Sequence, residues 1–196
     1  MNIIKRIKNK IQYEFYKKIK PEIIGGWKNA NGVFSQNTGI SNMSRLSSQK
    51  DNLFIGDNVY IGHFNYIDAV NAKVFIGNNV QITTNVTILT HSGHHLIRLI
   101  NNPNKAVKNT GKLSFKNEIY IGENTFIGPY SIVMPGTKIG KGCIISAYSY
   151  VKGEIPDFSV VRGQPAKIIG NTTEIDKNFL EKYPELIETY YLNGSN

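Results

Sequence analysis

The chain has 196 residues with a formal net charge of +9, and 40% of its residues are hydrophobic. This length and composition allow one domain with a sizeable core, and a single cysteine, Cys143, excludes an internal disulfide framework. The sequence has no run of about 18 apolar residues for a membrane span and no apolar signal-peptide core near its start, so we expect a cytoplasmic protein.

The first predicted element is a basic amphipathic helix at the N-terminus, within a segment 1–24 that we separate from the main domain. Pro21 ends the helical pattern, and seven Lys or Arg residues against Glu14 give this helix +6 of the net charge. The apolar residues that recur every fourth position are Ile3, Ile7, Ile11, Phe15 and Ile19. Two interpretations remain open. The helix lies on an anionic membrane, or its apolar stripe packs on the end of the domain that follows.

An irregular stretch at 25–52 comes next, in which Val33, Ile40 and Leu46 are candidate core positions. A six-residue repeat then begins, with an aliphatic residue at every sixth position. Its aliphatic positions are Ile55, Ile61, Ile67, Ile76, Ile82, Ile88, Ile121, Ile127, Val133, Ile139, Ile145 and Val151. Nine residues separate Ile67 from Ile76, so we expect 69–75 to bulge out of the regular path.

A period of six fits neither an α-helix nor simple strand alternation. It predicts an all-β solenoid over 25–170, with five or six coils in which one aliphatic residue per face points to the axis. Small residues at the crowded corners complete the pattern in the second block. They are Thr125, Ser131, Thr137, Cys143 and Ser149. Cys143 is therefore expected to be a packed thiol and not a nucleophile.

The repeat is interrupted by a loop at 92–116, and a histidine cluster marks its root. Such an insertion at a solenoid corner costs little, and long ordered loops are usually functional. The cluster consists of His91, His94 and His95. After the second block, a tail at 171–196 is predicted to be helical, to be interrupted at Pro184 and to cap the open end of the solenoid.

The hexads, the Thr90-His91 pair and the closing segment Gly163-Gln-Pro-Ala-Lys167 resemble the hexapeptide-repeat acyltransferases, and in particular the galactoside and maltose type of sugar O-acetyltransferase. The resemblance implies a left-handed parallel β-helix, whereas the general rule for parallel crossovers would predict a right-handed one. It also implies a homotrimer with active sites between subunits.

The resemblance further implies that a histidine at the loop root is the general base. Removal of the hydroxyl proton needs such a base, and histidine is the usual one near neutral pH. His91 is the first candidate, with His94 and His95 as alternatives. Asp68, about one coil earlier, either orients that histidine or caps a turn through its own backbone. The residues assigned to the acceptor side are His94, His95, Arg98 and Asn85.

The expected donor is acetyl-CoA, with no metal. Aligning the second block with the family places five residues on or beside CoA-contacting positions, and these are Phe126, Ala147, Lys152, Arg162 and Lys167. The three cations suit the phosphates on electrostatic grounds alone. One departure affects this region, because many relatives have Thr-Lys where this chain has Lys152-Gly153.

The predicted function is O-acetylation of a sugar hydroxyl in a cell-surface glycan or its precursor. Polar loop residues would meet the acceptor, and they include Asn101, Asn102, Asn104, Lys105 and Asn109. If the N-terminal helix binds lipid, the enzyme works at the inner membrane surface.

Three alternatives stay open: N-acetyl transfer to an amino sugar, a γ-type carbonic anhydrase, and a non-enzymatic scaffold. The anhydrase needs zinc ligands on stacked coils, whereas three of the four histidines here fall within five residues. Nucleic acid is not an expected partner, because the charge gathers in one helix without aromatic residues on a sheet.

Overall fold

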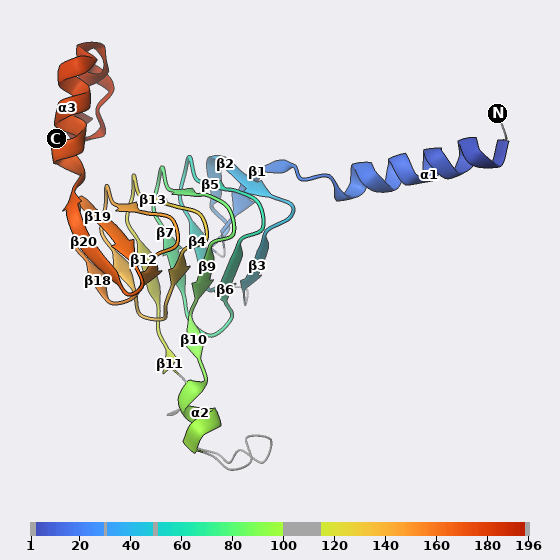
Figure 1. Ribbon diagram of the computed structural model, residues 1–196, viewed down its shortest axis with the longest axis horizontal. Coiled ribbons are helices and arrows are strands. Elements are labelled where there is room, and N and C mark those ends of the chain that lie inside the picture. Colours follow the sequence, from blue (N-terminus) through green and yellow to red (C-terminus); the bar gives the residue numbers. More distant parts are fainter. Residues whose placement is uncertain (1–2, 30, 49–50, 100–114, 195–196) are drawn as a thin grey trace.

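Three parallel β-sheets form the body of the protein in a computed structural model, which describes residues 3–29, 31–48, 51–99 and 115–194. The chain passes from sheet A to sheet B to sheet C and then returns to sheet A one turn further along the stack (Figure 1). Each strand pairs in parallel with its equivalents in the turns before and after it.

Sheet A contains, in spatial order, β1 (Ile23–Lys28), β2 (Phe34–Ser41), β5 (Tyr60–Ile61), β8 (Gln81–Ile82), β13 (Phe126–Ile127), β16 (Ile144–Ile145), β19 (Ser159–Gly163) and β20 (Ala166–Asn171). Sheet B contains β17 (Tyr150–Val151), β14 (Ile132–Val133), β9 (Thr87–Leu89), β6 (Tyr66–Ala69) and β3 (Arg45–Ser48). Sheet C contains β18 (Glu154–Ile155), β15 (Lys138–Ile139), β12 (Ile119–Ile121), β7 (Val74–Ile76) and β4 (Leu53–Ile55).

The remaining elements lie outside these sheets. They are α1 (Ile3–Ile19), β10 (His91–Ser92), α2 (His94–Leu99), β11 (Phe115–Lys116), α3 (Thr172–Lys182) and the 3₁₀ helices η3 (Pro184–Thr189) and η4 (Tyr191–Gly194).

The core is a set of aliphatic columns that run along the stack. In sheet A, Ile61 pairs with Ile82, Ile82 with Ile127, and Ile127 with Ile145. All four are fully buried, and the predicted aliphatic positions of both repeat blocks belong to the buried core. The predicted small residues are buried too, which confirms their corner positions. The six-residue spacing therefore correctly identified the inward-facing residues.

A ladder of asparagines holds the corner between sheets C and A. Asn37, Asn58, Asn79 and Asn124 occupy equivalent places in successive turns, and all four have positive φ. The side-chain amides of the first three each donate to the amide oxygen of the next asparagine, at 3.0–3.2 Å. Asparagine suits this corner because it tolerates the left-handed backbone conformation and carries both a donor and an acceptor.

Antiparallel strands close both edges of sheet A. At one end β1 pairs antiparallel with β2, and at the other β20 pairs antiparallel with β19. These pairings cover the edges that a parallel stack would otherwise leave open. They also mark where the regular turns stop, since neither β1 nor β20 pairs in parallel.

Two details of the irregular segments differ from expectation. Ile40 is buried and Leu46 packs against the core as predicted, but Val33 is 59% exposed because it precedes β2 at the end of the β1–β2 hairpin. The bulge predicted at 69–75 is shorter, because Ala69 and Val74 are buried strand residues.

The terminal helices stand away from the coils (Figure 1). Among the described residues of α1, Ile7, Ile11 and Phe15 are 55–64% exposed, so the interpretation in which this stripe packs on its own domain is wrong. The C-terminal helices form and break at Pro184 as predicted. They do not bury their apolar residues against the end of the stack, since Phe179 and Ile187 are 58% and 47% exposed.

The capping prediction fails because β20 already closes that end of sheet A. The tail instead meets one corner. At this corner Gly142, with a φ of +63°, occupies the position that follows Asn124 in the ladder. The Tyr191 hydroxyl packs so close to Gly142 that a Cβ there would collide with it. Within the described part of the chain, no helix combines the length and apolarity that a membrane span requires.

Replacing Asn79 by Ala should lower the free energy of unfolding by more than replacing it by Gly. Both changes remove the ladder bonds to Asn58 and Asn124, but only Ala is strained at the Asn79 φ of +57°. We expect Asn79→Ala to be the less stable variant by about 1 kcal/mol. Urea unfolding at fixed protein concentration measures this difference, and equal stability would contradict a role for backbone conformation in the ladder.

Candidate active site

The candidate site begins where the chain leaves the regular turns after β9. Asp68 in β6 pairs with Leu89 in β9, so the two lie side by side in adjacent turns. Two residues after Leu89, His91 starts β10, which pairs antiparallel with β11 outside the three sheets. From the repeat alone we expect His91 in the last regular coil before the loop, but it lies on this two-stranded arm. The arm ends in α2, and Figure 1 shows it projecting from the side of the stack.

Asp68 and His91 form a direct pair across two turns. His91 Nδ1 lies 2.6 Å from Asp68 Oδ2, and Asp68 is only 1% exposed whereas the His91 side chain is 45% exposed. Because a carboxylate accepts, Nδ1 carries the proton, and in the neutral ring Nε2 keeps its lone pair. This arrangement holds an exposed histidine in the tautomer that a general base requires.

Asp68 also caps its own turn. Its Oδ1 accepts from the Val70 backbone N–H at 3.1 Å, while Thr90 Oγ1 lies 3.5 Å from Oδ2. The two roles that the sequence left as alternatives are therefore both present in the geometry, one on each carboxylate oxygen. The bond to Val70 fixes the carboxylate, and the carboxylate in turn fixes the His91 ring.

The other two histidines of the cluster, His94 and His95, follow Ser92 in the sequence and lie in the first turn of α2. Their rings are 4.1 Å apart, and His94 Nδ1 lies 2.7 Å from Ser92 Oγ. Together with Lys152 they line a small hollow of about 120 Å³, which Ser92, Met134 and Pro135 complete. The structure thus joins two residues assigned to the acceptor side with one assigned to the cofactor side.

The remaining acceptor-side candidates are more scattered. Arg98 is exposed in α2, and Asn85 occupies the corner between β8 and β9 with its amide donating to Thr84 Oγ1 at 3.1 Å. His63, the fourth histidine, is partly buried, and its Nδ1 lies 2.6 Å from Ser41 Oγ. The loop residues Asn101, Asn102, Asn104, Lys105 and Asn109 lie outside the described residues.

The cofactor candidates lie in the later turns. Arg162 and Lys167 are direct partners across the β19–β20 hairpin, and both are exposed. Phe126 is partly buried in β13, and Ala147 is exposed at the corner after β16. The hairpin therefore brings two of the three predicted cations side by side, while Lys152 lies with the histidines.

The sequence did not predict a pair of stacked tyrosines beside Ala147. The rings of Tyr130 and Tyr148 stack at 4.9 Å, nearly parallel, and both residues have positive φ. Gln164 Nε2 donates to the Tyr148 carbonyl at 2.8 Å, which ties the corner to the closing segment. The available signal was the spacing of the two tyrosines, which are 18 residues apart in the six-residue repeat.

Cys143 behaves as a structural residue. Its Sγ lies 3.2 Å from the Pro156 carbonyl, and burial raises the pKa of the thiol above its usual value. The thiol therefore stays protonated and is a poor nucleophile. Within the described residues, no group of three or more His, Cys, Asp or Glu side chains is arranged to hold a metal ion.

Comparison with known proteins supports the repeat architecture of the three sheets. Residues 118–153 match the bacterial transferase hexapeptide (six repeats) family. The chain therefore carries the hexapeptide repeat over these residues. It is 35% identical over 103 residues to the galactoside O-acetyltransferase of Escherichia coli, a match that covers 52% of this chain and 45% of that protein.

Two solved structures share the fold of this hexapeptide-repeat domain. The N-acyltransferase AntD from Bacillus cereus, in complex with dTDP and 3-hydroxybutyryl-CoA, gives a TM-score of 0.59 at 19% identity, covering 76% of this chain and 79% of AntD. The hexapeptide-repeat acetyltransferase VCA0836 from Vibrio cholerae gives 0.56 at 19% identity, covering 70% and 72%. The matches to the curated relatives are shorter and span 19–45% of their lengths.

Replacing Asp68 by Asn should reverse the tautomer of His91. The new Oδ1 can still accept from Val70, which leaves the amide NH₂ facing Nδ1 as a donor. The neutral ring must then accept at Nδ1 and carry its proton on Nε2. Nitrogen-15 NMR of the imidazole distinguishes the two forms, with His63 as an internal control that should not change. An unaltered His91 signal would contradict the pairing.

Proposed function

We propose that this protein transfers an acetyl group from acetyl-CoA to a hydroxyl group of a sugar. The observation that carries the proposal is the His91–Asp68 pair, which presents Nε2 of an oriented histidine at the root of the inserted arm. The galactoside O-acetyltransferase relative supports a sugar hydroxyl as the acceptor. His91 is the proposed catalytic base and Asp68 the residue that positions it.

The proposed reaction is a direct transfer. Nε2 of His91 takes the proton of the acceptor hydroxyl as its oxygen attacks the thioester carbonyl, and Asp68 stabilises the imidazolium that forms. The tetrahedral intermediate collapses by breaking the C–S bond, and the imidazolium returns its proton to the leaving thiolate. Backbone N–H groups would stabilise the oxyanion. With Cys143 buried and protonated, direct attack without an acyl-enzyme fits the described residues.

The proposed donor site runs along the later turns. Exposed Arg162 and Lys167, side by side on the β19–β20 hairpin, suit the phosphates of acetyl-CoA. Phe126, Ala147 and Lys152 are proposed to contact the rest of the molecule. Because Lys152 shares a hollow with His94 and His95, we place the thioester end near this hollow. That CoA and an acyl-CoA occupy related N-acyltransferase structures supports this type of donor.

The assembly is proposed from the same resemblance. We infer that the turns wind as a left-handed β-helix, that three copies associate with the sites between them, and that the enzyme works in the cytoplasm. We further propose three segments, an N-terminal helix at 1–24, the transferase domain at 25–170 with its loop at 92–116, and a C-terminal tail at 171–196. A stack of flat sheets offers broad faces that association can bury.

N-acyl transfer to an amino sugar is the second candidate. AntD, which shares the fold, is an N-acyltransferase crystallised with dTDP. Its likeness at 19% identity shows the fold alone, whereas the galactoside O-acetyltransferase matches at 35% identity over 103 residues. A sugar hydroxyl also needs a base more than an amine does, because an alcohol is the weaker nucleophile. The oriented His91 therefore favours O-transfer.

Replacing His91 by Ala should lower turnover by about 10²–10⁴, which is the usual contribution of a positioned base. Affinity for acetyl-CoA should change little, because the proposed donor cations lie on other turns. Steady-state kinetics and calorimetric titration with CoA measure the two effects separately.

His94→Ala and His95→Ala are the matched controls for this experiment. Both remove an imidazole from the same arm without touching Asp68. If either control abolishes turnover while His91→Ala stays active, the assignment of the base is wrong.

The acceptor class can be tested by screening for thioester consumption with acetyl-CoA. We expect activity with hydroxylated monosaccharides, nucleotide sugars or sialylated glycans, and we expect it to weaken when residues 94–112 are shortened, because the arm would form the acceptor side. Product analysis must show an ester. Acetylation of amines only would contradict the O-transfer proposal and favour the second candidate.

A further inference from the structure

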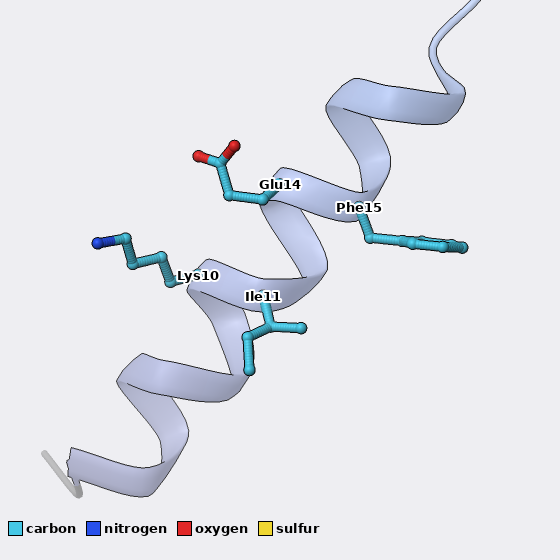
Figure 2. Close-up of a pocket in the computed structure, with 4 residues that line it drawn as sticks. All are labelled: Lys10, Ile11, Glu14 and Phe15. Carbon is cyan, nitrogen blue, oxygen red and sulfur yellow. The ribbon is translucent and has the colours of Figure 1, made fainter.

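Helix α1 exposes an apolar stripe that its own domain does not cover. It extends from the end of the stack where β1 lies, on a short link that ends before Ile23 (Figure 1). Ile7, Ile11 and Phe15 are 55%, 64% and 64% exposed. Figure 2 shows Ile11 and Phe15 on one side of the helix and Lys10 and Glu14 on another. Three large apolar side chains at this helical spacing form one continuous stripe.

The same helix, with Lys20 just after it, accounts for most of the net positive charge of the protein. Its cations together with Lys20, less Glu14, amount to +6, whereas the whole chain carries +9. Lys5, Lys8 and Lys10 are exposed in the described part of the helix. The apolar stripe is therefore flanked by cations with a single acid among them.

We propose that α1 lies flat on an anionic membrane, with Ile7, Ile11 and Phe15 inserted among the acyl chains and the lysines at the phosphate headgroups. An exposed apolar stripe flanked by Lys and Arg is the pattern of an interfacial helix, and it meets both the apolar and the anionic parts of such a surface. Like every other described helix, α1 is not both long and apolar enough to span the bilayer. This proposal is independent of the chemistry at His91.

Charge favours a membrane over a second copy of the chain as the occupant. Two helices of +6 packed along their stripes would bring like charges together, and every other surface of a second copy belongs to a chain of net charge +9. An anionic lipid surface instead attracts each cation. At a membrane surface the lysines stay in water among the headgroups while the apolar stripe is buried. A rigid protein face that covered the stripe would not leave the lysines hydrated in this way.

The link between α1 and β1 makes this contact important for the rest of the molecule. Only three residues, at 20–22, separate the two elements, and such a segment reaches about 10 Å when extended. Docking of α1 would therefore hold the first turns of the stack close to the membrane surface. An acceptor attached to a lipid would then be concentrated at the enzyme.

Vesicle co-sedimentation with the full chain tests the proposal. We expect binding to vesicles of 30% phosphatidylglycerol in phosphatidylcholine, and little binding to phosphatidylcholine alone. Lys5→Gln, Lys8→Gln and Lys10→Gln together should weaken binding by about 100-fold, at roughly fivefold for each cation. Ile11→Ser with Phe15→Ser should weaken it at least tenfold as well, because the stripe supplies the apolar part. Added salt should weaken binding of the unaltered chain.

Asn9→Ser with Gln12→Ser is the matched control, since both residues are exposed on α1 outside the stripe. It should bind like the unaltered chain, and all variants should keep the thermal unfolding of the coils and the turnover of a soluble acceptor. Equal binding to both kinds of vesicle, or no binding to either, would overturn the proposal. So would a stripe variant that changes the sedimentation coefficient of the lipid-free protein, because α1 would then pack on another copy.

Discussion

Parallel pairing of equivalent residues in successive turns is the constraint on which the rest of the structure depends. Because Ile61, Ile82, Ile127 and Ile145 stand one above another, each buries its side chain against its own counterparts. The asparagine ladder applies the same rule at a corner, where the side chain bonds to its equivalent in the next turn. In such a stack, stability is close to a sum of contacts between neighbouring turns.

This constraint also explains how a long insertion leaves the stack intact and creates a site. Ile82 pairs with Ile127 and Ile88 with Val133, so the turns before and after the insertion meet in register. The chain leaves and returns at one corner, and the β10–β11 ribbon holds the exit. His91 lies at that exit, within reach of Asp68, whose carboxylate is held by the Val70 backbone N–H in its own turn. An exposed imidazole is thus oriented by a buried carboxylate.

The two ends of the stack are closed by strands, and this leaves the terminal helices available for other contacts. Strands β1 and β20 cover the edges of sheet A by antiparallel pairing, so neither α1 nor α3 is needed there. The exposed apolar side chains of α1 are therefore not a packing defect of the coil. Their position beside a dense cluster of cations agrees with a surface that meets a partner.

The sequence alone determined the periodic part of this protein. Aliphatic residues every sixth position and small residues at the corners are local signals that repeat, so the core residues and the interruption after Ile88 could be read without coordinates. The non-periodic parts could not. Neither the exposure of Val33 nor the positions of α1 and α3 outside the sheets follow from a repeat, because such segments take their places from contacts outside the pattern.

For the candidate site, the sequence indicated which residues to consider, and only the tertiary structure decided how they meet. Asp68 and His91 are 23 residues apart, and their contact depends on the register between β6 and β9 and on the path of the chain after Thr90. The meeting of Lys152 with His94 and His95 depends on where the arm folds back. These distances are set by the packing of separate turns, which no local pattern of residues encodes.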